Sequence, residues 1–117
     1  MTLILMVHGS RVSATSTELN QLAIQLAKSS NVAVATAYME LQHPTLEERI
    51  TELAAAGERQ IRILPLFILA GRHALEDIPA QVALCRQRFP ELELELAPHL
   101  GSQQAFLNSL VDIARSH

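Results

Sequence analysis

The segment from Ile61 to Pro79 constrains the fold of this chain more than any other. Its first half is almost wholly apolar, with Arg62 as the one charged residue before Gly71. A strand that is covered on both faces carries a run of this kind, although Pro65 within it cannot donate to a sheet ladder. The polar residues that follow Gly71 are Arg72, His73, Glu76 and Asp77. Because Pro79 suits the first turn of a helix, the segment predicts a buried strand, a polar loop and a helix start.

The rest of the chain repeats this pattern of a short apolar strand followed by a helix. The expected strands cover residues 2–7, 32–38, 60–67 and 92–96. Leucine and glutamate alternate in the last of them, which is typical of a half-exposed edge strand. Short strands that alternate with helices form parallel sheets with helices on their faces. The sequence therefore predicts an α/β fold, an open parallel sheet of about four strands with helices on both faces.

Local signals place the helix boundaries. Thr15 and Glu18 have the spacing of a capping box, so the first helix is expected to begin there. Pro44 suits the first position of the second helix, and Gly57 is expected to follow its last turn as a C-cap. Ser102 is expected to cap the last helix.

Length and composition exclude several classes of protein. The chain has 117 residues, which fits one domain covering residues 1–117. A net charge of −3 and an aromatic content of 3% argue against nucleic-acid binding. No signal peptide is recognisable, and no stretch approaches the roughly 20 apolar residues of a membrane span. Cys85 lies on an apolar helical stripe, so we expect it to be a core residue. Because it is the single cysteine, no disulfide can form within the chain, and we expect a soluble cytoplasmic protein.

Three ionisable side chains fall at the ends of the first three expected strands. They are His8, Glu40 and His73, at similar spacing along the chain. Because parallel strands end at one edge of their sheet, we expect these side chains to converge there. Two imidazoles and a carboxylate are a common ligand set for a divalent transition metal, so the sequence predicts a metal site. A neutral imidazole can also accept a proton near neutral pH, which makes His8 and His73 candidate catalytic residues, and Glu40 could be either the third ligand or a base.

Other side chains near the same edge are candidates for holding an anionic ligand. Arg11 and Arg72 follow the ends of the first and third strands, where they could bind carboxylates in a bidentate manner. Ser10 could bind a carboxylate through its hydroxyl group, and the chain lacks the Gly-x-Ser-x-Gly elbow of a serine nucleophile. His99 follows the fourth strand and His43 lies one turn beyond the second. Each of these histidines could equally be a hydrogen-bonded loop or capping residue.

Ordered motifs make the chain resemble a known family. They are Val-His-Gly-Ser-Arg at 7–11, Ala-Tyr-Met-Glu-Leu at 37–41, Leu-Pro-Leu-Phe-Ile-Leu-Ala-Gly-Arg-His at 64–73 with Asp-Ile-Pro at 77–79, and Ala-Pro-His-Leu-Gly at 97–101. The set resembles the short CbiX-type sirohydrochlorin chelatases, which are class II chelatases, and it covers nearly the whole chain. The family often has a further histidine where this chain has Gln103 or Gln104, and His99 stays outside the expected ligand set.

The resemblance implies an ATP-independent cobaltochelatase of the lyase class that inserts Co²⁺ into sirohydrochlorin during cobalamin (vitamin B12) biosynthesis. Relatives insert Fe²⁺ or Ni²⁺, and the metal is a substrate with no organic cofactor beside it. The metal-binding histidines of the family would fall on His8 and His73, and its metal-binding acid on Glu40. Long members carry two such halves, so a short chain is expected to form a homodimer. In such a protein, Ser10, Arg11 and Arg72 would hold the carboxylates of the substrate.

Two other functions fit the same residues. The first is a module that binds or delivers a metal without catalysis, which would leave the absorbance of a tetrapyrrole unchanged. The second is a doubly wound protein that binds a small ligand or phosphate, with structural histidines and no metal affinity. The chain has no Gly-x-Gly-x-x-Gly loop, which argues against a nucleotide ligand. The choice between sirohydrochlorin and precorrin-2 as substrate stays open at this point.

Overall fold

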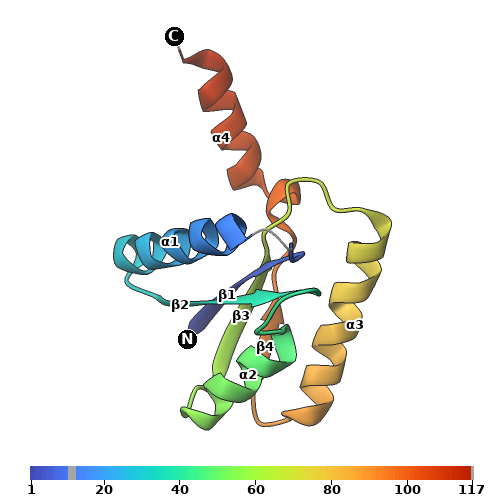
Figure 1. Ribbon diagram of the computed structural model, residues 1–117. Helices are drawn as coiled ribbons and strands as arrows, with labels where there is room; N and C mark the ends of the chain where they lie inside the picture. Colours follow the sequence, from blue (N-terminus) through green and yellow to red (C-terminus); the bar gives the residue numbers. More distant parts are fainter. Residues whose placement is uncertain (11–12, 117) are drawn as a thin grey trace.

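The part of the chain that the structure describes, residues 1–10 and 13–116, holds one sheet of four parallel strands (Figure 1). This computed structural model confirms the predicted α/β architecture. The strands are β1 (Thr2–Val7), β2 (Ala33–Tyr38), β3 (Gln60–Pro65) and β4 (Glu93–Leu96). The helices are α1 (Ser13–Ser30), α2 (Leu46–Ala55), α3 (Arg72–Arg88) and α4 (Gln104–Arg115), with a short 3₁₀ helix η1 (Leu100–Ser102). The strand order is β2-β1-β3-β4, which makes β4 an edge strand as predicted.

The register of the sheet brings the ends of the first three strands to one edge. Val7 at the end of β1 lies opposite Tyr38 at the end of β2, and Met6 lies opposite Pro65. β3 ends at Pro65 rather than at Phe67, and one further hydrogen bond joins it to β1 beyond this point, from the Leu66 N–H to Met6 O at 2.8 Å. The loops that leave these strands therefore start side by side.

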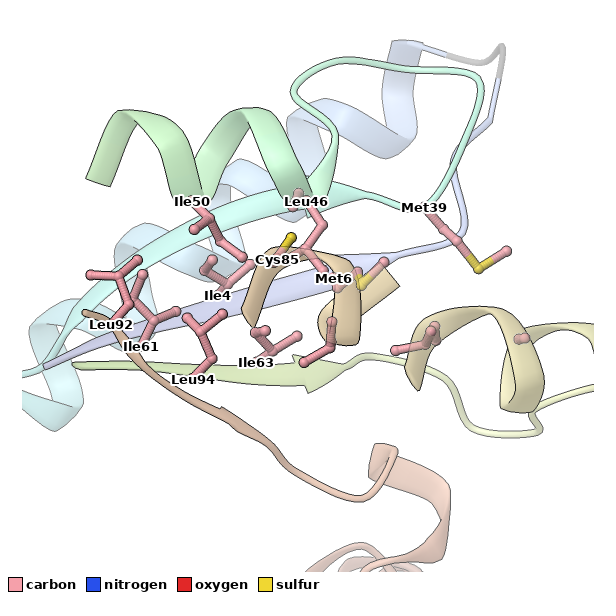
Figure 2. Packing of buried hydrophobic residues seen from close by; sticks show 14 residues of the cluster. Ile4, Met6, Met39, Leu46, Ile50, Ile61, Ile63, Cys85, Leu92 and Leu94 are labelled. Carbon is pink, nitrogen blue, oxygen red and sulfur yellow. The ribbon is translucent and has the colours of Figure 1, made fainter. Parts of the chain in front are cut away.

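Helices cover both faces of the sheet, as the sequence predicts (Figure 1). α2 and α3 lie on one face, where Leu46, Ile50 and Cys85 pack onto the strands (Figure 2). The strand residues beneath them are Ile4, Met6, Ile61, Ile63 and Leu94. α1 packs on the other face through Leu19 and Ala23. Cys85 is a buried core residue as predicted, and burial raises the pKa of its thiol.

Three predicted helix starts are wrong. α1 begins at Ser13, so Thr15 lies inside the helix and does not cap it. α3 begins at Arg72, which turns the predicted polar loop into helix and places Pro79 in the helix interior. Ser102 ends η1, and the N-cap of α4 is Gln103. Residues of these types are common at helix starts, but they also occur within helices or just before them. The residue type alone therefore does not fix the position at which a helix begins.

α2 begins at Leu46, two positions after Pro44, which was predicted to open it. Thr45 is its N-cap and forms a capping box with Glu48, so Pro44 precedes the cap instead of opening the helix. The helix ends with Ala56 as C-cap, and Gly57 follows it with a φ of +96°. That left-handed conformation is the one in which glycine is favoured after a helix, as the sequence predicts.

α4 leaves the body of the molecule and projects away from the sheet (Figure 1). Phe106 near its start is half-buried, whereas its other apolar side chains face solvent. The exposed set is Leu107, Leu110, Val111 and Ile113. The projection contributes to principal extents of 49 × 33 × 29 Å. An isolated helix of about 12 residues is marginal in water, so this amphipathic helix calls for a covering surface. Within the described residues, no helix has the length and apolar character needed to cross a membrane.

Candidate metal-binding rim

His8 and Glu40 lie in direct contact at the carboxyl edge of the sheet. We call this edge the rim, formed by residues 8–10, 39–43, 66–73 and 97–101. The ladder between β1 and β2 continues one step into the loops, where the Met39 N–H donates to Val7 O (2.8 Å) and the Glu40 N–H donates to His8 O (3.0 Å). The side chains then meet with His8 Nε2 2.6 Å from Glu40 Oε1. Both are about half exposed, so the pair is open to a ligand from solvent.

Gly9 allows the two loops to approach so closely. Its φ is +111°, and a Cβ atom built there would lie only 1.9 Å from Glu40 O. No side chain fits in that space, so only glycine brings the segment after His8 against the backbone of Glu40. The sequence shows this glycine beside His8, but the contact that requires it is tertiary. Sequence reasoning therefore missed its role.

His73 does not join the pair in this structure. Across residues 1–10 and 13–116, no three His, Cys, Asp or Glu side chains lie close enough together to hold one metal ion. The expected convergence of His8, Glu40 and His73 is thus only partly observed. The reason is that α3 already starts at Arg72, which fixes His73 in a helical turn on the surface instead of in a loop.

The loop between β3 and α3 lies beside His8 and also contacts the segment that follows β4. The Phe67 ring lies 6.5 Å from the His8 ring, centroid to centroid, at an interplanar angle of 59°. The Gly101 N–H donates to Phe67 O at 2.8 Å, and a Cβ atom at Gly101 would lie 1.6 Å from Ile68 O. The segment after β4 therefore packs against this loop through backbone contacts. Neither Phe67 nor Gly101 was assigned a role from the sequence.

A small apolar pocket of about 150 Å³ opens beside this loop. Phe67, Leu75, Ile78 and Pro98 are among its lining residues, and His99 adds an imidazole. His99 thus lies at the rim as predicted. The pocket is too small for a tetrapyrrole and could hold only an edge of a large ligand.

The remaining predicted site residues are Ser10, Arg11 and Arg72. The Ser10 N–H donates to Gln42 Oε1 at 2.7 Å, and Arg11 lies outside the described residues. Arg72 is highly exposed and its Nε lies 3.1 Å from Glu76 Oε1. Such an exposed pair is weak, so the guanidinium remains available to an anion.

His43 belongs to the cap of α2. Its Nδ1 lies 2.7 Å from Glu48 Oε1, the carboxylate that also accepts from the Thr45 N–H. The hydrogen bond from the Thr45 backbone, followed by that to His43, lowers the pKa of Glu48 to about 2. This contact is the capping role that the sequence left open as an alternative for His43.

The model of the CbiX family matches residues 2–116, nearly the whole chain. This chain belongs to the CbiX family. Membership confirms the resemblance that the ordered motifs indicate.

Relatives of this CbiX-family chain include chelatases of two metals. It is 37% identical over 78 residues to a sirohydrochlorin cobaltochelatase of Methanosarcina acetivorans, a match covering 66% of this chain and 60% of the relative. It is 27% identical over 106 residues to a sirohydrochlorin ferrochelatase of Priestia megaterium, covering 90% of this chain and 40% of the relative. The chain thus spans less than two thirds of the length of either protein.

Solved structures share the fold of this CbiX-family chain. A CbiX protein from Marinobacter aquaeolei is 28% identical, with a TM-score of 0.82 over 97% of this chain and 93% of that one. The sirohydrochlorin chelatase SirB from Bacillus subtilis subspecies spizizenii, in complex with cobalt, is 26% identical. Its TM-score is 0.74, and the match covers 97% of this chain but only 50% of SirB. The fold described here therefore corresponds to about half of the SirB chain.

The rim of this CbiX-family chain offers one nitrogen and one oxygen ligand in contact. Imidazole nitrogen suits late first-row divalent metals, and a carboxylate adds charge that holds the cation. Two adjacent donor atoms with ready access from solvent suit the exchange of a metal ion. A closed structural site with four protein ligands would lack the open position that exchange requires.

Proposed function

We propose that this CbiX-family chain inserts a divalent metal ion, first of all Co²⁺, into sirohydrochlorin. The observation that carries the proposal is the His8–Glu40 contact, 2.6 Å between Nε2 and Oε1, at an edge open to solvent. Cobaltochelatases among the relatives support the reaction and the metal. The single buried Cys85 fits a reducing compartment, and we propose the cytoplasm.

His73 is the third metal ligand in this proposal. It stands in the first turn of α3, after a loop whose Ile68 and Leu69 are exposed. Gly71 at the N-cap has open space around it, since a Cβ atom there would meet nothing within 4 Å. A metal bound to His8 and Glu40 can therefore draw the start of α3 toward this pair, which would complete a set of two imidazoles and one carboxylate.

The metal-binding pair also accounts for proton removal. The macrocycle loses two pyrrole protons when a divalent metal enters, so total charge is conserved. When the metal passes from His8 to the pyrrole nitrogens, the Nε2 lone pair that held it becomes free to accept one of these protons. Glu40, released at the same time, can accept the other, and both groups are sufficiently exposed to return protons to water.

Cationic and polar groups of the rim hold the substrate's carboxylates in this proposal. Arg72 can exchange its exposed contact with Glu76 for a bidentate contact with a substrate carboxylate. Arg11 and Ser10 are the further candidates predicted from the sequence. Precorrin-2 is the competing tetrapyrrole, and direct assay of both compounds separates them.

Fe²⁺ is the second candidate metal, because the chain also matches sirohydrochlorin ferrochelatases over 88–90% of its length. Imidazole and carboxylate ligands accept Co²⁺, Ni²⁺ and Fe²⁺ alike, so ligand type does not choose among them. Insertion rates measured with each ion under anaerobic conditions rank the three.

The proposal is tested by following the absorbance of sirohydrochlorin as Co²⁺ is added to the wild type and to variants. We expect His8→Ala and His73→Ala each to lower the insertion rate by more than about tenfold, because each removes a metal ligand. His43→Gln is the matched control, since this histidine serves the α2 cap, and it should keep the rate. Full activity in both alanine variants would refute the assignment. Metal binding without any change in absorbance would instead identify a metal-delivery module.

We propose that two copies of this chain form a homodimer. Two features support it: α4 exposes an apolar face that its own sheet does not cover, and the fold matches half of the longer SirB chain. A second copy would supply surface equivalent to the other half of SirB and make a cleft large enough for a tetrapyrrole. Light scattering should give twice 12.9 kDa, and a mass of 12.9 kDa at working concentration would exclude the dimer.

A further inference from the structure

A polar network joins the loops that carry His8 and Glu40, and its side chains, those of Gln42, Ser16 and Tyr38, have no role in the proposed reaction. Gln42 is its centre: Oε1 accepts from the Ser10 N–H at 2.7 Å, and Nε2 donates to Ser16 Oγ at 2.6 Å. The Tyr38 hydroxyl donates to the same Ser16 oxygen at 3.0 Å. The network therefore links the loop after β1, the first turns of α1 and the loop after β2.

The orientation of the Gln42 amide is fixed by its partners. A backbone N–H can only donate, so the oxygen of the amide must face Ser10. The amide nitrogen then faces Ser16, whose oxygen accepts from both Nε2 and the Tyr38 hydroxyl. Tyr38 is buried and Gln42 is half-buried, which shields these hydrogen bonds from water.

The network closes a small frame around the metal-binding pair. On one side of the frame, the Glu40 N–H donates to His8 O. Two residues further along both loops, the Gln42 side chain bonds to the Ser10 N–H. Between these ties lie Gly9 and Leu41, with φ values of +111° and +69°. The frame thus consists of two hydrogen-bonded rungs joined by two residues in left-handed conformation.

Leu41 has a backbone conformation that residues other than glycine rarely adopt. A non-glycine residue in the left-handed region is strained, and Leu41 is 60% exposed, so packing of its side chain does not compensate. The Gln42 N–H donates to Glu40 O at 2.9 Å and closes the turn. The side chain of Gln42 then ties this turn to the loop after β1 through the Ser10 N–H, and to α1 through Ser16 Oγ.

We propose that Gln42 is a positioning residue that keeps the loops after β1 and β2 in the register that brings His8 against Glu40. Its effect on metal insertion rests on the function proposed above. Its effect on the contact between His8 and Glu40 does not. The hydrogen bonds of Gln42 reach the Ser10 N–H, Ser16 Oγ and Glu40 O, so it acts on the pair through Ser10 and through the turn at Leu41.

The test compares Gln42→Leu, which keeps the size of the side chain and removes both hydrogen bonds, with Gln42→Glu. A carboxylate can accept from the Ser10 N–H and, after rotation of the hydroxyl, from Ser16 Oγ–H, so the glutamate variant should restore the frame. Gln60→Leu is the matched control, because Gln60 starts β3 at the opposite edge of the sheet. Ser16→Ala removes the second tie and serves if Gln42→Leu does not fold.

Two readouts separate positioning from mere stability. The first is the ring ¹⁵N and Nε2–H resonance of His8, which reports its hydrogen bond to Glu40. The second is Co²⁺ affinity by calorimetry, well below the thermal midpoint of each variant. We expect Gln42→Leu to lose the His8 signature and to weaken Co²⁺ binding about tenfold. We expect Gln42→Glu to retain the signature and Gln60→Leu to retain both.

An unchanged His8 signature in Gln42→Leu and Ser16→Ala, with only a lower thermal midpoint, would overturn the proposal. A wild type that neither binds Co²⁺ nor alters sirohydrochlorin would instead refute the proposed function. The His8 resonance would still decide whether Gln42 positions the pair, so the two failures are distinguishable.

Discussion

At the scale of single residues, the rim depends on backbone positions that admit no side chain. Gly9 combines a left-handed φ with a close approach to Glu40 O, whereas Gly57 has a similar φ and open space around it. Gly57→Ala should therefore cost about 1–2 kcal/mol for backbone strain alone. Gly9→Ala should cost about 1–3 kcal/mol more, because the loops must separate.

Urea unfolding of the two alanine variants measures this difference, and Co²⁺ calorimetry shows whether the His8–Glu40 pair survives. The Gly9 variant is expected to bind Co²⁺ more weakly, while the Gly57 variant binds it as the wild type does. Equal losses of stability in the two variants would show that the contact with Glu40 O carries no cost.

The sequence allowed part of this site to be predicted. His8 and Glu40 were expected to meet because parallel strands end at one edge, and the structure confirms their contact. His73 stands apart because the start of α3 depends on how many residues the preceding loop uses, which the pattern of apolar residues does not specify. Gln42 was overlooked because its role lies in hydrogen bonds between loops, and no local spacing encodes them.

At the scale of elements, a carboxylate ties the start of β1 to the start of β3. Glu58 accepts from Thr2 Oγ1 at 2.6 Å and from the N–H groups of Arg59 and Gln60. These hydrogen bonds, the one from Thr2 first, hold the pKa of Glu58 at about 2, below its ordinary value of 4.5. The folded state thus binds this proton less readily than the unfolded state. The stability that Glu58 contributes is present above pH 4.5 and is lost as the pH falls toward 2.

We expect Glu58→Gln to flatten the fall in stability between pH 4.5 and pH 2. The variant should lose stability relative to the wild type at pH 7 and approach it at pH 3. Urea midpoints at the two pH values check this, with the exposed Glu91→Gln as control. A gap between wild type and Glu58→Gln that stays constant from pH 7 to pH 3 would contradict the assigned cause.

Strands were easier to predict than helix starts, for a physical reason. A buried strand is recognisable by a continuous apolar run, and a half-exposed strand by alternating apolar and polar residues. β1, β2 and β4 lie where such patterns occur. A helix start rests on one or two residues that also occur elsewhere in helices. Pro79 shows this, since α3 continues through it without interruption from Arg72 to Arg88.

At the scale of the whole molecule, the sequence predicts the layers but not the course of the last helix. Alternating strands and helices restrict the chain to a parallel sheet covered on both faces, which is observed. The apolar stripe of α4 indicates that one face must be covered, and the stripe alone does not say by which surface. Only the three-dimensional arrangement shows that α4 points away from its own sheet (Figure 1).

The exposed stripe of α4 gives the sharpest test of the proposed dimer. Ile113 is 69% exposed in the single chain, so Ile113→Glu should be harmless to an isolated monomer. In a dimer that buries this face, the same change places an unpaired charge in an apolar contact. We therefore expect Ile113→Glu to lower the mass from light scattering to 12.9 kDa and to abolish the concentration dependence of the thermal midpoint.

Asn108→Glu is the control, because Asn108 lies on the polar side of α4, where its Oδ1 accepts from Gln104 Nε2. It adds the same charge to the same helix and should leave the dimer intact. If both variants stay dimeric, a surface other than the apolar face of α4 joins the two copies. If Ile113→Glu becomes monomeric and also stops inserting metal while Co²⁺ still binds at His8, the tetrapyrrole site requires both subunits and the metal site requires only one.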